Sequence, residues 1–280
     1  DLHQIGSVAY HWLPLKYIGM KDGDGRFNGI ANGQIYNGGS LATMMEYPQL
    51  AQPGPAAVRL PDNYNKLFPV LGVGRIRRGP ASTTVLLKGS NRFLSLRKGK
   101  AVIAAVRFAS AFFGKGQFIP GSGQRIGDSY ALKQELTAAY YQPLDPPRRV
   151  TPDTRRSLIR ERKQTELCRL TYQATEEETA KGLALHIKTN GQKGVPFTVE
   201  INLRGNGRLS GCSASQAAPE TLFMDEDYAT YSNGGDGIRF GPRLREHSYT
   251  EGRGQDKLPG RCVYLTTYTP VDHVIHFEWI

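Results

Sequence analysis

The chain lacks any apolar run approaching the roughly 20 residues needed to cross a bilayer, so no membrane span is expected. Its three cysteines, Cys168, Cys212 and Cys262, lie far apart and form no CxxC pair, which excludes zinc-like spacing and permits at most one disulfide. The sequence also contains no GxSxG, HExxH, Walker A or EF-hand pattern. We therefore expect neither a bound metal nor a cofactor.

Acidic residues are missing from one long segment. Between Asn63 and Gly127 there is no Asp or Glu, whereas Lys and Arg number twelve. The chain has a net charge of +11, so the remaining residues sum to −1 and the whole excess lies in this segment. A field of one sign attracts polyanions, and the candidates are nucleic acid, an anionic membrane or an acidic polysaccharide. The alternative is a basic surface whose charge only keeps the protein in solution.

Nucleic acid is the weakest of these candidates. The basic segment contains no helix-turn-helix, zinc finger or RNP-like strand. Five of its aromatic residues lie in apolar runs, so we predict that they belong to the core; they are Phe93, Phe108, Phe112, Phe113 and Phe118. We expect no nucleic-acid partner.

Helical patterns are scarce, and short strand-like runs take their place. The chain has 32 glycines and 17 prolines, and from Thr83 onward runs such as "AVIAAVRFAS", "FTVEINLRG" and "CVYLTTYTP" alternate with turns such as "NGQKG". More than about ten strands at hairpin spacing must stack or close to cover their apolar faces. The predicted fold is all-β, a large antiparallel β-sandwich over residues 81–280. An irregular N-terminal extension, residues 1–80, is expected to pack on it.

The run "FGPRLREHSYTEGRGQ" combines proton-transfer groups with guanidiniums. In an extended segment residues i and i+2 share a face, so His247 and Tyr249 are candidate catalytic groups that present together. Three arginines flank them: Arg243, Arg245 and Arg253. Such a set suits β-elimination from a uronic acid polymer, because a cation neutralises the carboxylate while a base and an acid move protons. The alternative is a turn whose arginines bond to backbone carbonyls.

A second candidate for sugar contact lies near the start of the chain. The stretch "AYHWLPLKY" brings together Tyr10, His11 and Trp12. Aromatic side chains with polar tips are the usual platform for sugar rings, whose apolar faces stack on them. The same residue types also anchor irregular segments to a core, and the sequence leaves both readings open.

Several stretches resemble a known family. They are "AVRFASAFFGKGQF", "YYQPL", "GVPFTVEINLRGNGRLSG", "DGIRFGPRLREHSYTEGRG" and "VYLTTYTPVDHVIHFEW". Their pattern and order over residues 80–280 are similar to the β-rich C-terminal half of heparinase II/III-like proteins, polysaccharide lyases in which a helical toroid precedes a large β-sandwich. The resemblance implies a sandwich fold, a secreted or periplasmic setting and an acidic glycan as ligand.

The sequence departs from that family at its N-terminal side. The family carries much of its catalytic machinery on the toroid, and the first eighty irregular residues cannot build one. No family catalytic residue is therefore carried over. We predict a carbohydrate-active protein that binds an acidic polysaccharide in a basic groove, either as a lyase or as a relative lacking the catalytic toroid. A non-catalytic structural or accessory module of a glycan-handling system is the alternative.

Overall fold

The computed structural model describes residues 46–47, 61–142, 163–216, 218–250 and 257–280. The chain divides into two units, Asp1–Leu60 and Pro61–Ile280. Most of the first unit lies outside the described residues, and so does the expected packing of residues 1–60 on the sandwich. Within the described ranges, no helix is long and apolar enough to cross a membrane.

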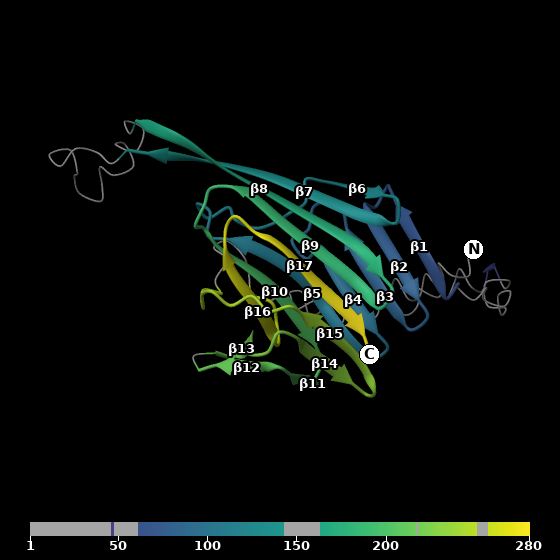
Figure 1. The fold of residues 1–280 in the computed structure, drawn as a ribbon. Helices are drawn as coiled ribbons and strands as arrows, with labels where there is room; N and C mark the ends of the chain where they lie inside the picture. Colours follow the sequence, from purple (N-terminus) through teal and green to yellow (C-terminus); the bar gives the residue numbers. More distant parts are fainter. Residues whose placement is uncertain (1–45, 48–60, 143–162, 217, 251–256) are drawn as a thin grey trace. The chain divides into compact units, whose positions relative to one another are not determined.

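The second unit is built from β-strands (Figure 1). Their bounds are β1 Asn63–Phe68, β2 Val73–Arg78, β3 Ala81–Leu86, β4 Leu94–Lys98, β5 Ala101–Ser110, β6 Ser122–Ile126, β7 Ser129–Tyr141, β8 Gln164–Thr179, β9 Gly182–Gly191, β10 Pro196–Arg204, β11 Arg208–Ser210, β12 Cys212–Ser215, β13 Ala218–Met224, β14 Ala229–Asn233, β15 Asp236–Gly241, β16 Cys262–Tyr268 and β17 Asp272–Trp279.

These strands form two open sheets. One has nine strands in the order β1-β2-β3-β4-β5-β10-β16-β13-β12, and the other has eight in the order β11-β14-β15-β17-β9-β8-β7-β6. Neighbouring strands are antiparallel except for the parallel pair β13 and β16. The all-β, sandwich-like fold predicted from strand periodicity and turn residues is thus confirmed. Strands β7 and β8 form a long hairpin that extends past its neighbours (Figure 1).

The core consists of side chains that both sheets direct inward. Burial alternates along β3, where Ala81, Thr83 and Val85 are buried and the residues between them are half-buried. The ring of Phe108 on β5 lies 5.3 Å from that of Phe197 on β10 and 5.6 Å from that of Tyr172 on β8 in the opposite sheet. Aromatic packing therefore joins the two layers.

The prediction that the aromatics of the basic segment are core residues is correct for four of the five. Phe93, Phe108, Phe112 and Phe118 are 0–1% exposed, whereas Phe113 is 47% exposed. The prediction is wrong for Phe113 because β5 ends at Ser110 and the chain then turns, with Phe113 in a left-handed conformation at φ 48°. An apolar run does not reveal such a turn.

The nine-stranded sheet begins well before residue 81. Strands β1 and β2 have few apolar residues, because Asn65 and Gly74 occupy inward positions where a strand pattern would show a hydrophobic side chain. At Gly74 the ring of Tyr130 takes the space, and an added Cβ would lie 2.5 Å from its ring carbon Cζ. A glycine is therefore required there by close packing, and the strand pattern is hidden.

Candidate anion-binding face

The segment without acids folds into strands β1 to β5 of the nine-stranded sheet and the β6 strand of the other. In β2, β3 and β4 the inward residues Ile76, Val85, Leu94 and Leu96 are 0–3% exposed. The residues between them face outward, away from the core. We call the outward side of β1–β4 the basic face; its members are Tyr64, Lys66, Phe68, Val73, Arg75, Arg77, Ser82, Thr84, Leu86, Ser95 and Arg97.

Strand register arranges these side chains in rows across the sheet. One row runs Lys66, Arg75, Thr84 and Ser95 on successive strands. The second row runs Tyr64, Arg77, Ser82 and Arg97. Since neighbouring strands are about 4.8 Å apart, each row presents cations and hydroxyls at regular short intervals, and the second row adds the Tyr64 ring.

Hydrogen bonds orient the cations on this face. The Arg75 guanidinium donates to the hydroxyl of Thr84 and, at 3.4 Å, to that of Ser82. The Arg97 Nε donates to the carbonyl of Gly99 at 2.7 Å. The Lys66 ammonium lies 5.3 Å from the centre of the Phe68 ring. These neutral partners hold the side chains without cancelling their charge.

One carboxylate reaches the basic face among the residues that the structure describes. Asp62 pairs with Arg77 at 3.1 Å, and both side chains are partly exposed. An exposed pair of this kind is weak and screened by salt. The face as a whole therefore remains positive and suited to anions, with guanidiniums whose fork geometry matches carboxylate or sulfate oxygens.

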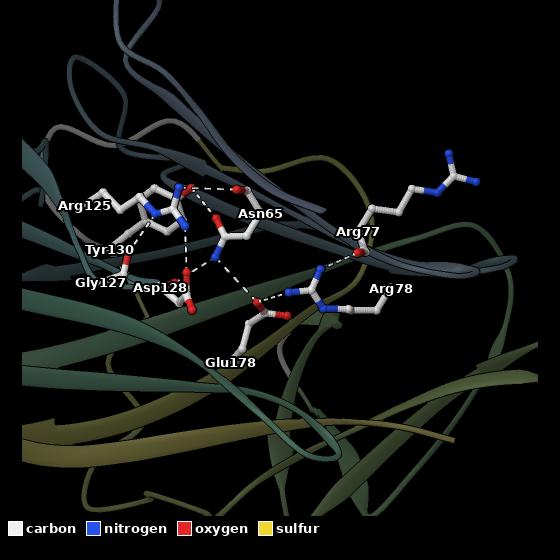
Figure 2. Close-up of polar contacts among 8 residues, drawn as sticks. All are labelled: Asn65, Arg77, Arg78, Arg125, Gly127, Asp128, Tyr130 and Glu178. Carbon is white, nitrogen blue, oxygen red and sulfur yellow. Dashed lines mark hydrogen bonds and ion pairs between the residues drawn. The ribbon is translucent and has the colours of Figure 1, made fainter. Parts of the chain in front are cut away.

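A different polar cluster ties the edges of the two sheets together (Figure 2). Arg125 at the end of β6 donates to the Asn65 carbonyl at 3.3 Å and pairs with Asp128 at 2.7 Å. Asn65 accepts from the Tyr130 hydroxyl at 2.6 Å and donates to the Asp128 carbonyl at 2.8 Å. The charges of Arg125 and Asp128 neutralise each other within this cluster, so these contacts stabilise the fold and leave no charge for a ligand.

Glu178 extends that cluster towards β2. Its carboxylate pairs with Arg78 at 2.6 Å and lies 3.5 Å from the amide nitrogen of Asn65 (Figure 2). Two residues earlier on β8, Glu176 is fully buried and neither carboxyl oxygen has a hydrogen-bond partner. Burial raises the pKa of Glu176 to about 8, and the nearby Glu178 and Glu177 add to the rise. Glu176 is therefore held neutral at pH 7.

A buried ion pair lies further along the nine-stranded sheet. Arg107 on β5 and Glu200 on β10 are directly opposite, paired, and 2% and 5% exposed. Burial raises the pKa of the Glu200 carboxyl, and hydrogen bonds from Arg107 and Tyr264 oppose the rise. Because both groups are enclosed, this pair is closed to a large ligand, and removing either partner would leave a charge buried in the sheet.

The structure brings His247 and Tyr249 together but engages the histidine in backbone contacts. Their ring centroids are 6.5 Å apart. His247 Nδ1 accepts the backbone N–H of Tyr249 at 3.1 Å, and Nε2 lies 2.8 Å from the carbonyl oxygen of Thr267. Nε2 must therefore carry the ring proton and donate it. Both nitrogens are occupied, which is the arrangement of a residue that fixes a turn.

The two described arginines of this run meet at Asp225 rather than at the histidine. Arg243 donates to the Asp225 carbonyl at 2.7 Å. Arg245 pairs with the Asp225 carboxylate at 3.0 Å and lies over the Phe223 ring. Arg253, like Tyr10, His11 and Trp12, lies outside the described residues.

We expect His247→Ala to lower stability without affecting anion binding. The change leaves the Thr267 carbonyl and the Tyr249 N–H without their side-chain partner, so unfolding in urea should show a loss of about 1–3 kcal/mol. Ser248→Ala at the exposed neighbouring position is the control and should change neither property. Cleavage of an acidic polysaccharide by the wild type that is lost in His247→Ala would contradict the structural role.

Sequence reasoning located the basic segment but missed the basic face. Lys66, Arg75, Arg77 and Arg97 were visible as charges, and the spacing of Arg75 and Arg77 around Ile76 is a two-residue alternation that marks one face of a strand. Their assembly into rows depends on the pairing of four strands. Among the described residues, no group of three or more His, Cys, Asp or Glu could hold a metal ion.

Comparison of the chain with protein-family models, with curated proteins and with solved structures finds no match.

Proposed function

We propose that the protein binds an acidic polysaccharide on the basic face. The observation that carries the proposal is the pair of rows that begin at Lys66 and Tyr64. The first places two cations beside two hydroxyls, the second alternates arginines with hydroxyl-bearing residues, and the Phe68 ring lies beside Lys66. A chain of uronate or sulfated sugars offers the complementary pattern of anions, hydroxyls and apolar ring faces. The rows run across the strands, so an extended polymer would lie across β1 to β4.

Binding rather than cleavage is the function that the contacts support. The histidine proposed as base donates through Nε2 and accepts through Nδ1, so it offers no lone pair to a sugar proton. The arginines beside it are bonded to Asp225. The role therefore corresponds to a glycan-recognition module in a secreted or periplasmic setting, the setting implied by the resemblance to heparinase II/III-like proteins.

The test is a charge-matched comparison of two triple variants. Lys66→Gln, Arg75→Gln and Arg97→Gln together should weaken binding to polygalacturonate or heparin by roughly tenfold to a hundredfold, because each exposed cation contributes up to about 1 kcal/mol. Lys181→Gln, Lys193→Gln and Arg208→Gln remove the same charge from other surface positions and should have a small effect. Isothermal titration at low and moderate salt provides the measurement.

Either of two results would count against the proposal. Equal losses in both triple variants would mean that net charge, not the basic face, attracts the polymer. Tighter binding to single-stranded DNA than to any of the polysaccharides, with a steeper salt dependence, would point to nucleic acid instead.

A further inference from the structure

Three connections of the nine-stranded sheet gather at one end of the sandwich. Successive antiparallel strands bring the β1–β2 turn (69–72), the β3–β4 connection (87–93) and the β5–β6 connection (111–121) to the same side. Hydrogen bonds join them: Leu87 N–H donates to the Gly72 carbonyl at 2.8 Å, and Gly89 N–H to the Pro120 carbonyl at 3.1 Å. We call this set of three connections the loop end.

The tips of the loop end carry apolar side chains in water. Val70 is 89% exposed and Leu71 is 69% exposed in the β1–β2 turn, and Phe113 and Ile119 are 47% and 38% exposed in the β5–β6 connection. Turns of this length usually carry Gly, Asn, Asp or Ser. These four exposed apolar residues lie on two connections at the same end of the sandwich, and exposed apolar side chains gathered in this way mark interaction sites.

A tight turn places Phe113 at the tip of the β5–β6 connection. Phe113 and Gly114 both have positive φ, 48° and 69°, and the Lys115 N–H donates to the Phe112 carbonyl at 2.8 Å. The left-handed region costs a non-glycine residue such as Phe113 about 1–2 kcal/mol. The Phe113 ring lies 5.1 Å from that of Phe112 and remains 47% exposed, so the turn presents an aromatic side chain at the surface of the loop end.

The charged side chains on these three connections are all positive. Lys88, Arg92 and Lys115 are exposed on the same connections, which contain no Asp or Glu. The methylene groups of Lys88 pack against Gly72, where an added Cβ would lie 2.9 Å from Cε. That contact places the ammonium group beside the apolar β1–β2 tip.

We propose that the loop end docks on an anionic lipid surface. Val70, Leu71 and Phe113 insert at the boundary of the headgroups and acyl chains, while Lys88, Arg92 and Lys115 contact lipid phosphates and anionic headgroups. Apolar insertion combined with a group of cations is the pairing that gives stable, reversible attachment to a membrane surface without a span. A purely apolar protein partner would leave the cations unpaired, so charge complementarity favours the lipid. This surface is distinct from the basic face, and the inference does not depend on the proposed glycan binding.

Co-sedimentation with vesicles tests the proposal. The wild type should bind vesicles of equimolar phosphatidylserine and phosphatidylcholine, bind pure phosphatidylcholine weakly, and dissociate as salt is added. Combining Val70→Ser, Leu71→Ser and Phe113→Ser should lower the partition coefficient by about tenfold or more. Ile126→Ser, at a residue 56% exposed at the far end of β6, is the matched control and should leave binding unchanged.

A second variant keeps the proposal testable if the triple serine variant does not fold. Phe113→Gly removes the ring and suits the positive φ, so it should still fold and should bind the mixed vesicles less well. The proposal is overturned if the wild type ignores the mixed vesicles, or if the apolar variants bind as well as the wild type. It is also overturned if only the basic-face triple variant loses binding, or if sedimentation equilibrium shows a dimer that the apolar substitutions dissociate.

Discussion

Glu176→Gln is expected to stabilise the protein at pH 7 and to remove a decline in stability between about pH 4.5 and 8. The pKa of Glu176 is about 8 in the folded state against an ordinary value of 4.5. Within that window the unfolded chain releases a proton that the native state retains, so native stability falls as pH rises. At about 1.4 kcal/mol per pH unit, the variant should exceed the wild type by about 3 kcal/mol at pH 7.

Urea unfolding at a series of pH values measures this difference. Below pH 4.5 both states of the wild type hold the proton at Glu176, so the two proteins should be of similar stability there. Glu177→Gln, on the exposed side of the same strand, is the control and should change the pH slope little. A wild type and Glu176→Gln that differ by the same amount at every pH would show that the pKa of Glu176 is the same in the native and unfolded states, which would contradict the prediction.

Replacing either partner of the Arg107–Glu200 pair should be among the most destabilising single changes. The pH dependence of the lost stability should differ according to which partner remains. Glu200→Gln leaves a buried guanidinium that cannot lose its proton, so we expect a loss of about 3–5 kcal/mol that is nearly constant with pH. Arg107→Met leaves a buried carboxyl that can become neutral. Removing Arg107 takes away a hydrogen bond and a charge that oppose the rise in the pKa of Glu200, so the cost should be large at high pH, where the carboxyl is ionised, and should shrink as pH falls and the carboxyl takes up a proton.

The double variant Arg107→Met with Glu200→Leu serves as the control for this pair. With both side chains replaced by apolar ones, neither a guanidinium nor a carboxyl is left in the interior, and the loss should be smaller than in either single variant at pH 7. Thermal or urea unfolding of the four proteins completes the cycle. A double variant as unstable as the sum of the two single variants would mean that the two residues act independently.

Some strands could be predicted from neighbouring residues alone, whereas others depend on contacts with residues far along the chain. The strand over residues 101–110 could be read from its apolar run, and β5 has the same bounds. Strands β1 and β2 could not, because Asn65 and Gly74 sit inward and their environment is made by Tyr130, far along the chain. Phe113 looked like core because its neighbours are apolar, but the turn after Ser110 exposes it.

The candidate sites show the same division. The spacing of His247 and Tyr249 correctly suggested that their rings lie together, but the ring nitrogens are bonded by backbone groups of Thr267 and of Tyr249. Whether Nε2 of His247 is free to act as a base depends on Thr267, which is twenty residues further along the chain. Arg75 and Arg77 belonged to a basic segment in the sequence and to a basic face in the structure, because pairing with β1, β3 and β4 aligned them with other polar residues.

The sequence by itself determined the all-β class, the frequency of turns and the confinement of the positive charge to one segment. These properties depend on local alternation, on glycine and proline, and on composition, which neighbouring residues supply. Tertiary structure alone decided the rows of the basic face, the exposure of Phe113 and the burial of Glu176 without a partner. Each depends on how strands distant in sequence pair and how the two sheets stack, since register decides which side chains become neighbours and burial is the joint effect of both layers.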